Sequence, residues 1–486
     1  MSARGGSVRA LREEKVCVTM KFSPLLAVSR QVAVSLCLIA VGLVRAQENA
    51  PPEKHACFTW GGSIRTRYEY YNRLGTYNGD RGGEDKSEGF LRVRTRLWGQ
   101  LQHRQLTAHL QLGNEFRHYF FREHMEGRRR FPDQLFIDQL WFRYEGLADW
   151  IDLKVGRQGL RDFASDRLFS EGTPVDGSRS DFFDAVRVTL NVDEQRTRQL
   201  EIIGLTIAHH DWLPTWGHQH NARGAHPPRT PYDYSGSNHR ELGGILYWRD
   251  RSNRALPWES YAIWKQEDGR YSSALARETK RPRQFNTYTF GVRLLPRFSD
   301  ALSGELEAAI QLGDDHLLAG MGYASLAYAW QQTPWNPTAK IGLYGLTGSS
   351  EGSRGRHTWH AVFNRSANLG DVVSSLYPNL DHNNLLYPHL ALSLATEAKC
   401  HTFDLEFGPL LAPARERDAY GHTGPLRGLL CQLIWNTDMA AFLGDERLKG
   451  LEFGTYVALL YRGNYFPEPL RQDLSSTFTV EFRYTF

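Results

Sequence analysis

The chain has 486 residues, of which 41% are hydrophobic and 23% are charged. Past residue 50 no stretch approaches the ~18 consecutive apolar residues that a transmembrane helix requires, which excludes a helical membrane protein. The formal net charge of +4 comes from the first 46 residues, and the rest of the chain holds 51 basic and 52 acidic residues, a balance that disfavours a nucleic-acid-binding protein.

The first 46 residues have the pattern of a secretory signal peptide. Basic residues precede the apolar run VAVSLCLIAVGLV, and cleavage is expected after Ala46. The residues before Met20 are unlike the start of a signal peptide, so Met20 is an alternative first residue. The expected organisation is a signal peptide (1–46), a short periplasmic segment (47–57) and a barrel domain (58–486). An uncleaved anchor helix is the alternative for the first part.

From residue 58 onward apolar and polar residues alternate in segments of about ten residues, bounded by Gly, Pro, Asn and Asp, which is typical of β-strands. About eighteen strands are expected, and sixteen is the alternative count. Their expected first residues are Ile64, Phe90, Leu106, Leu135, Ile151, Asp184, Arg198, Glu241, Trp258, Gln284, Leu302, Met321, Thr338, Leu390, Thr402, Arg427, Leu451 and Thr477.

The connections between these segments alternate in length. Long polar stretches such as NRLGTYNGDRGGEDKSE are followed by tight ones such as HRQ. Outer-membrane β-barrels have short periplasmic turns and long extracellular loops, which segregate in this way. Two connections depart from the pattern: the one at GDDHLL is short where a long loop is expected, and NTDMAAFLGDERLKG is long where a short turn is expected.

The final segment, STFTVEFRYTF, is the clearest strand. Phe478, Val480, Phe482, Tyr484 and Phe486 share one face. This aromatic and aliphatic row resembles the C-terminal strand by which outer-membrane proteins are recognised for assembly. In lipid only a closed sheet pairs every backbone polar group. We therefore expect an all-β, transmembrane antiparallel β-barrel in the bacterial outer membrane, in contact with lipid and the assembly machinery. A soluble β-sandwich is the alternative.

The stretch FLRVRTRLWGQL, residues 90–101, places an arginine at every second position. Alternate side chains of a strand point to opposite faces, so these cations share the lumenal face while an apolar row faces lipid. The same assignment on other strands predicts a basic lumen. The predicted substrate path consists of Arg65, Arg67, Arg92, Arg94, Arg96, Arg143, Lys154, Arg157, Arg187, Arg293 and Arg483.

Two interpretations of this lining are open. Rings of Arg and Lys in a pore favour anions, and guanidinium groups bind carboxylates and phosphates with two hydrogen bonds. Alternatively, the arginines fill the lumen as ion pairs with carboxylates such as Glu69, Glu115, Asp138 and Glu307. The first interpretation is preferred, and even then most of the individual arginines are expected to be partly structural.

Signals for catalysis and for cofactors are weak. Five histidines lie in one predicted external loop without HExxH spacing, so surface histidines are favoured over a metal site; they are His209, His210, His218, His220 and His226. The stretch GLTGSSEGSRG lacks the strand-turn-helix context of a nucleophile elbow, and no phosphate-binding glycine loop follows a strand. We therefore expect no enzymatic activity, no metal and no cofactor.

The segment LKVGRQGLRDFASDRLFSEGTPVDGSRSDFFDAVRVTL, residues 153–190, resembles the hallmark of the alginate-export family of outer-membrane barrels. The matching motifs are GRQ at 156–158 and the RSDFFDAVR stretch. The resemblance implies an eighteen-stranded porin that passes a negatively charged uronic-acid polymer, with Arg157 and Arg187 on its path. Strict alternation points Arg157 at lipid, so this role requires a bulge or a position near the rim.

The leading hypothesis is an outer-membrane channel that passes anionic solutes, above all an alginate-like acidic polysaccharide, through an arginine-rich lumen. Its expected partners are that polysaccharide or small anions and periplasmic export components, with no nucleic acid, and the direction of transport is left open. The alternative is a general anion-selective diffusion porin for small sugar acids or organic acids. A third hypothesis is a barrel enzyme that acts on lipid or peptide at the outer leaflet. Anion-selective conductance in planar bilayers separates the two channel hypotheses from the enzyme.

Overall fold

The computed structural model describes most of the chain after residue 55. The predicted signal peptide and all but the last two residues of the predicted periplasmic segment lie outside the described residues. The described ranges are 56–73, 87–122, 134–160, 163–165, 167–168, 183–207, 213–216, 241–268, 284–350, 356–363, 369–374, 383–396, 400–415, 424–466, 471 and 473–486.

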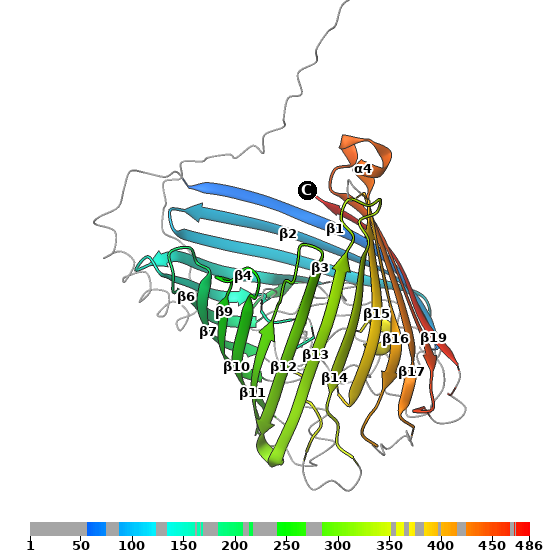
Figure 1. The fold of residues 1–486 in the computed structure, drawn as a ribbon. Helices are drawn as coiled ribbons and strands as arrows, with labels where there is room; N and C mark the ends of the chain where they lie inside the picture. The colour runs from blue at the N-terminus through cyan, green and yellow to red at the C-terminus, as the bar shows by residue number, and fades with distance from the viewer. Residues whose placement is uncertain are drawn as a thin grey trace, which may run out of the picture.

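Eighteen antiparallel strands form one closed barrel (Figure 1). The first strand, β1 (Cys57–Asn72), pairs with β2 and also with the last strand, β19 (Leu474–Thr485), which closes the ring. The two-residue strand β8 (Thr215–Trp216) pairs with β4 and is not part of the ring, because β7 pairs directly with β9. The other strands are β2 (Glu88–His103), β3 (Leu106–Arg122), β4 (Gln134–Leu147), β5 (Ile151–Gln158), β6 (Phe183–Asn191), β7 (Arg198–Ile207), β9 (Glu241–Asp250), β10 (Trp258–Asp268), β11 (Gln284–Leu294), β12 (Leu302–Gly313), β13 (Leu317–Ala329), β14 (Thr338–Leu346), β15 (Leu385–Ala395), β16 (His401–Leu411), β17 (Leu426–Asp438) and β18 (Leu451–Arg462).

The helices of the described part are short and lie in the connections between strands. Within that part, no helix is long and apolar enough to cross a membrane. The helices of the described residues are η2 (Asp314–His316), α3 (Asp371–Ser374), α4 (Met439–Leu443) and η3 (Glu446–Leu448).

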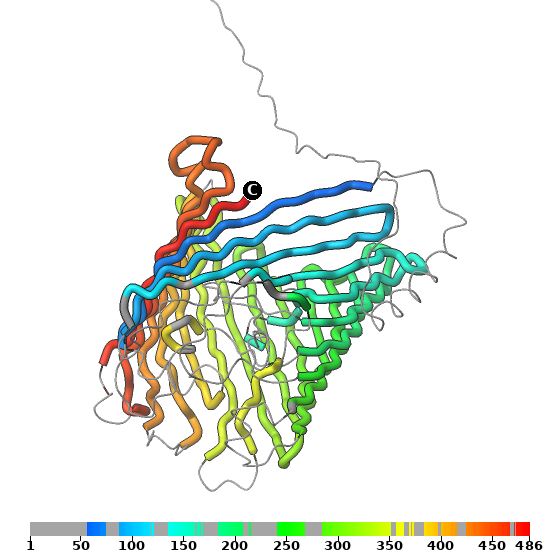
Figure 2. The backbone as a smooth tube through the Cα atoms, turned by 180° about the vertical axis from the view of Figure 1, so that it is seen from behind, coloured from blue at the N-terminus to red at the C-terminus, as the bar shows by residue number. Residues whose placement is uncertain are grey.

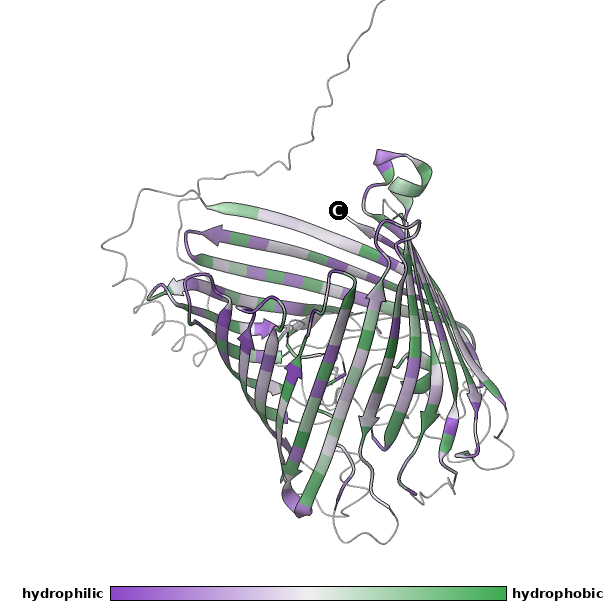
Figure 3. Cartoon of the chain, in the orientation of Figure 1, coloured by the Kyte–Doolittle hydropathy of each residue, from purple (hydrophilic) through white to green (hydrophobic). Residues whose placement is uncertain are grey.

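Hydrophilic and hydrophobic residues alternate along the strands, as the coloured bands in Figure 3 show. On β12, Leu306 and Ile310 point outward and are 48% and 46% exposed, whereas Glu307 and Gln311 point inward and are buried. A closed ring with an apolar exterior satisfies the backbone in lipid. The predicted all-β barrel is confirmed, with eighteen strands rather than sixteen, and so is its location in the bacterial outer membrane.

The connections define two ends of the barrel. At the turn end, where β1 begins and β19 ends, Gly62 and Phe486 exchange two backbone hydrogen bonds of 3.0 Å. The connections at this end are mostly short, and the longer ones lie at the opposite loop end. Both irregular connections that the sequence indicates are present. Only η2 joins β12 to β13 at the loop end, and residues 439–450 join β17 to β18 at the turn end.

Two connections from the loop end fold into the barrel, and Figure 2 shows pieces of both inside the ring. The first, called here the β5–β6 segment, is described at residues 159–160, 163–165 and 167–168. The second, the β14–β15 segment, is described at 356–363 and 369–374. Their apolar side chains, Phe163 and Phe363 among them, are buried against inward side chains of the strands. The hydrophobic core therefore lies inside the barrel and narrows its lumen.

Candidate functional site: the lumen

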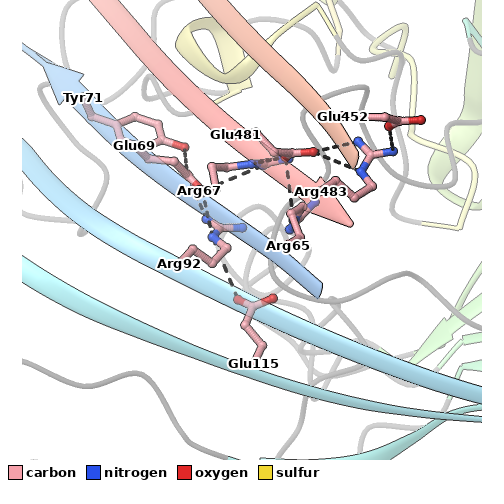
Figure 4. A network of polar contacts seen from close by, with 9 residues as sticks. All are labelled: Arg65, Arg67, Glu69, Tyr71, Arg92, Glu115, Glu452, Glu481 and Arg483. Carbon is pink, nitrogen blue, oxygen red and sulfur yellow. Dashed lines mark hydrogen bonds and ion pairs between the residues drawn. The ribbon is translucent and has the colours of Figure 1, made fainter. Parts of the chain in front are cut away.

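Inward side chains of β19, β1 and β2 form a row of alternating cations and carboxylates (Figure 4). Arg67 donates to Glu481 of β19 through Nε, at 2.7 Å, and Nη2, at 2.5 Å. Arg65 lies 3.7 Å from the same carboxylate. On the other side, Arg92 binds Glu69 with Nε at 2.8 Å and Nη2 at 3.0 Å. Such two-point contacts between guanidinium and carboxylate are among the stronger polar contacts in proteins.

The row continues to β3 and β4. Arg92 lies 3.9 Å from Glu115, and Arg96 lies 3.0 Å from Asp138, which is fully buried at a register shift between β3 and β4. We call this group the arginine ladder; it consists of Arg65, Arg67, Arg92, Arg94, Arg96, Glu69, Glu115, Asp138 and Glu481. Four of its five arginines are at most 7% exposed. Because four carboxylates lie among these five arginines and the group is nearly closed off from water, the geometry favours the structural interpretation over substrate passage for them.

Arg157 of β5 joins three neighbouring strands, β4, β5 and β6, at one place in the wall, which we call the seam. The preceding Gly156 has a φ of +122°, and a Cβ there would lie 2.2 Å from the carbonyl oxygen of Leu140, so the position requires glycine. This is the irregularity that the alternation pattern demanded, and it leaves Arg157 1% exposed. Its guanidinium donates to Asp184 of β6 at 3.0 Å and to the Ile137 carbonyl of β4 at 3.1 Å. Arg157 therefore ties β4 to β6 across β5.

The β5–β6 segment crosses the lumen directly after this seam, and one side of it is anchored on β9 to β12. The backbone N–H of Ala164 donates to the Tyr247 hydroxyl at 3.1 Å, and its carbonyl accepts from Arg293 at 3.1 Å. The Ser165 hydroxyl donates to Glu307, a buried carboxylate. Arg293, predicted to line the substrate path, thus holds the backbone of an inward segment.

The other side of the β5–β6 segment reaches β13, β14 and β16. Tyr344 donates to the carbonyl oxygen of Arg167 at 2.9 Å. The Arg167 guanidinium lies 3.6 Å from Glu406 and 5.5 Å from the centre of the Tyr323 ring. Anchors on both walls make this segment a fixed constriction near the middle of the lumen.

The β14–β15 segment is anchored nearer the loop end. Lys265 of β10 donates to the Ala361 carbonyl at 2.8 Å and contacts Glu267 at 2.7 Å. His360 approaches the same carboxylate at 2.8 Å, and its backbone N–H donates to Gln311 at 2.9 Å. These contacts hold the described part around residues 360 and 361 against β10 and β12, nearer the loop end than the first segment.

A cavity of about 570 Å³ opens between the β5–β6 segment and the turn end. We call it the turn-end cavity. Five cations line it and only two carboxylates do; these residues are Arg143, Lys154, Arg187, Arg196, Arg249, Asp152 and Glu201. The side chains of Arg143 and Arg196 are 42% and 46% exposed, in contrast to the buried arginines of the ladder. In this cavity, positive charge is accessible to a solute in the lumen.

Each lining carboxylate of the turn-end cavity is shared by two arginines. Asp152 lies 3.5 Å from Arg143 and 3.4 Å from Arg196. Glu201 lies 2.6 Å from Arg187 and 3.7 Å from Arg249. Arg143 also lies 3.0 Å from Glu145, and Arg249 also donates to Glu259 at 3.4 Å. A guanidinium carries five N–H donors, so Arg143 and Arg196, with side chains 42% and 46% exposed, can donate to a carboxylate or phosphate in the cavity as well.

The remaining cations of the predicted path are bound at the edges of these groups. The ammonium of Lys154 lies 4.2 Å from the centre of the Trp141 ring. Arg483 of β19 joins the ladder near the turn end, 2.7 Å from Glu481 and 3.4 Å from Glu452, with its side chain 41% exposed. Of the predicted path, the structure therefore places Arg143, Lys154 and Arg187 in the turn-end cavity.

Sequence reasoning missed several lumenal residues. Arg249 and Glu201 occupy inward positions of alternating strands, so period two on β9 and β7 was a signal that could have found them. Arg196 lies in the turn between β6 and β7, and Arg167 lies in an inward segment that the pattern assigns to an external loop. Neither of these two positions carries a periodic signal.

In the part of the chain that the structure describes, no group of three or more His, Cys, Asp or Glu residues is arranged to hold a metal ion. The histidines weighed as metal ligands, at 209, 210, 218, 220 and 226, lie outside the described residues.

A closed eighteen-stranded barrel with an apolar exterior and inward-folded connections has the architecture of an outer-membrane porin. Solved structures that are similar to it include Acinetobacter baumannii OccAB2, with 10% identity and a TM-score of 0.54 over 88% of this chain and 98% of that one. The outer membrane proteins opdK (11% identity, TM-score 0.53, 98% of that chain) and OprD (11% identity, TM-score 0.50, 93% of that chain) from Pseudomonas aeruginosa match the same share of this chain. These identities show the fold alone. No protein-family model and no curated protein sequence matches the chain.

The predicted membership of the alginate-export family is wrong. The similar solved structures include proteins of the OccK and OprD type, and export of alginate has no support from them. The arginines of the motifs behind this prediction connect neighbouring strands of the barrel wall. Arg157 ties β4 to β6, and Arg187 pairs with Glu201 on the adjacent strand. A basic strand that alternates with apolar residues is therefore no mark of a particular cargo.

Proposed function

We propose that the protein is an outer-membrane diffusion channel for small anionic solutes, such as sugar acids or organic acids. The observation that carries this proposal is the turn-end cavity, with five lining cations against two carboxylates. Partly exposed guanidiniums attract a carboxylate and replace part of its hydration shell. Several weak and salt-sensitive contacts let the solute leave as readily as it enters.

The inward segments support a small solute rather than a polymer. The β5–β6 segment is fixed at Ala164 and Arg167 to opposite walls, so a passing molecule has to fit beside it. A stiff chain of many sugar residues has to thread this constriction in extended form, whereas a single sugar acid can rotate past it. The similarity in fold to outer-membrane proteins fits a transporting role.

The test is the ion selectivity of the channel in planar bilayers with a salt gradient. The wild type should prefer anions, and the triple variant Arg143→Gln, Lys154→Gln, Arg196→Gln should lose about fivefold in the anion-to-cation permeability ratio. Removing cations beside a passing anion changes its free energy by about 1 kcal/mol in water-like surroundings, which corresponds to that factor.

The matched control is Arg447→Gln, which removes one cation outside the lumen, on a side chain that is 89% exposed in η3. Its permeability ratio should equal that of the wild type. A triple variant with unchanged selectivity, or a folded wild-type barrel that conducts no ions, would contradict the proposal.

A further inference from the structure

The connection between β17 and β18 is unlike the other connections at the turn end. It runs over residues 439–450 and is built as an ordered unit from α4 and η3. Asp438 accepts hydrogen bonds from the backbone N–H groups of Ala440 and Ala441, at 2.9 and 3.1 Å, and caps α4. Gly444, with a φ of 66°, ends the helix in the left-handed conformation. Caps at both ends fix the direction in which so short a helix points.

The next turn of this connection is fixed in the same way. Asp445 accepts from the backbone N–H of Arg447 at 3.0 Å and from its guanidinium at 2.7 Å. These hydrogen bonds, the one from the Arg447 side chain first, hold the pKa of Asp445 below its ordinary value. The two short helices differ in character. Charged side chains lie on η3, whereas α4 has the sequence MAAFL and carries none.

The apolar tip of α4 leans over the outer face of the barrel. Phe442 and Leu443 are 55% and 56% exposed. The Phe442 ring meets the ring of His401 edge-on at 5.0 Å, and His401 lies 6.2 Å from Trp435. His401 and Trp435 are at outward positions, in phase with the exposed Phe407 and Leu433 of the same strands. Figure 1 shows α4 projecting beyond the strand ends beside the C-terminus.

The rings below α4 belong to a belt of outward aromatic side chains at the turn end. Trp435 stacks on Phe403 at 5.6 Å and meets Phe453 at 5.4 Å, and Phe453 meets Phe482 at 5.2 Å. Aromatic belts of this kind mark the interface between the hydrocarbon and the headgroups around a barrel. Phe298, in the turn between β11 and β12 at the same end of the barrel, is also exposed, at 63%.

We propose that α4 is an interfacial membrane anchor. Its Phe442 and Leu443 insert at the boundary between the headgroups and the acyl chains of the leaflet at the turn end. Phe442 packs on side chains that lipid already surrounds, so the surface beneath α4 is continuous with the lipid-covered wall. A phospholipid surface therefore fits this tip, with the charges of η3 facing water. Interfacial helices bind membranes in this manner, with apolar residues toward the acyl chains and charged residues toward water.

The test is the depth of a nitroxide label in phosphatidylethanolamine and phosphatidylglycerol vesicles. The label is placed by Phe442→Cys in a chain whose five cysteines are replaced by alanine. We expect oxygen to relax the label at 442 more strongly than a water-soluble nickel chelate does. A label at Leu433→Cys, in the lipid-facing wall, should behave alike, and one at Arg447→Cys should show the reverse preference.

Heat-modified mobility on gels establishes that each labelled barrel is folded. A label at 442 that the nickel chelate reaches as easily as it reaches the label at 447 would place α4 in water and overturn the proposal. A label at 442 that neither reagent reaches would mean that another protein or a second copy of this chain covers α4. That result also contradicts insertion of α4 into lipid.

Discussion

The arginine ladder and the turn-end cavity use the same residue type to opposite effect. In the ladder, arginines such as Arg67 and Arg92 are 1% and 3% exposed and alternate with carboxylates on neighbouring strands. In the cavity, Arg143 and Arg196 share Asp152, and Arg143 also lies 3.0 Å from Glu145, but both arginine side chains are close to half exposed. The number of arginines on a strand therefore says little about accessible positive charge. The burial of each arginine, together with its carboxylate partners, decides it.

The largest expected effect comes from removing a carboxylate of the ladder. Glu69→Gln leaves Arg92 and Arg67 buried without their shared partner and weakens the hydrogen bond from Tyr71, which is 2.9 Å. Breaking a buried ion pair costs about 3–5 kcal/mol. We expect the free energy of unfolding, measured by urea titration in vesicles, to fall by that amount.

The same network supplies the control. Glu452 pairs with Arg483 at 3.4 Å, but its side chain is 55% exposed. Water screens such a pair, so Glu452→Gln should change the free energy of unfolding by no more than about 1 kcal/mol. Equal losses in Glu69→Gln and Glu452→Gln would mean that burial of the ladder does not set its contribution.

A second prediction concerns the seam. Arg157→Gln leaves the carboxylate of Asp184 without its guanidinium partner, and hydrogen bonds to charged groups contribute about 1.5–3 kcal/mol. We expect a loss of stability in that range, together with a noisier single-channel current, because the β5–β6 segment starts at this seam. The double variant Arg157→Gln, Asp184→Asn should recover part of the stability. If it is less stable than the single variant, charge pairing is not what Arg157 contributes.

A third prediction addresses the opposite side of the comparison. Arg196→Gln removes a side chain that is 46% exposed and 3.4 Å from Asp152. The stability cost should stay below about 1 kcal/mol, as for exposed pairs. The anion preference of the channel should nevertheless decrease in reversal-potential measurements. A loss of stability as large as that of Glu69→Gln would remove the distinction between the two regions.

The smallest effect is expected at Asp193, in the turn between β6 and β7. The Thr197 hydroxyl donates to its carboxylate at 2.5 Å and the backbone N–H of Arg198 at 2.7 Å, and both lower its pKa below the ordinary value of 3.8. Because the pKa of Asp193 is lower in the folded state, its ionised carboxylate stabilises the turn at pH values above 3.8. This stabilisation is lost as the pH falls through the pKa of the folded state. Amide exchange at residues 192–197 should therefore speed up on acidification, relative to unstructured peptide, but not in Asp193→Asn.

The strands were well predicted from the sequence because lipid imposes a simple rule on them. Alternation has to persist along the whole membrane-spanning length, so first residues such as Leu106, Ile151 and Thr338 coincide with those of the structure. The irregular turn at 439–450 was visible for the same reason, as a departure from an otherwise regular pattern. Its helical form and its place on the outer wall were not.

The partners of the lumenal charges were beyond the reach of the sequence. The positions of Arg67 and Arg92 follow from alternation, but their neutralisation depends on the register between strands, and Glu481 is 414 residues from Arg67 in the chain. The inward course of the β5–β6 segment was hidden as well. Its Phe163 and Leu168 are buried in the lumen, yet nothing local distinguishes such a segment from a loop that stays outside.

The ladder lies across the junction of the first and last strands, and this has a consequence for assembly. Joining β1 to β19 is the contact of greatest sequence separation in the barrel, and the entropic cost of closing a loop rises with its length. Before closure, β1 displays Arg65 and Arg67 beside Glu69, and β19 displays Glu481 beside Arg483. The contacts of Arg65 and Arg67 with Glu481 form only when these two edges meet, whereas two β1 edges would bring the arginines of both copies together. The chain thus carries its own guidance for closing into a ring rather than joining edge to like edge with a neighbouring molecule.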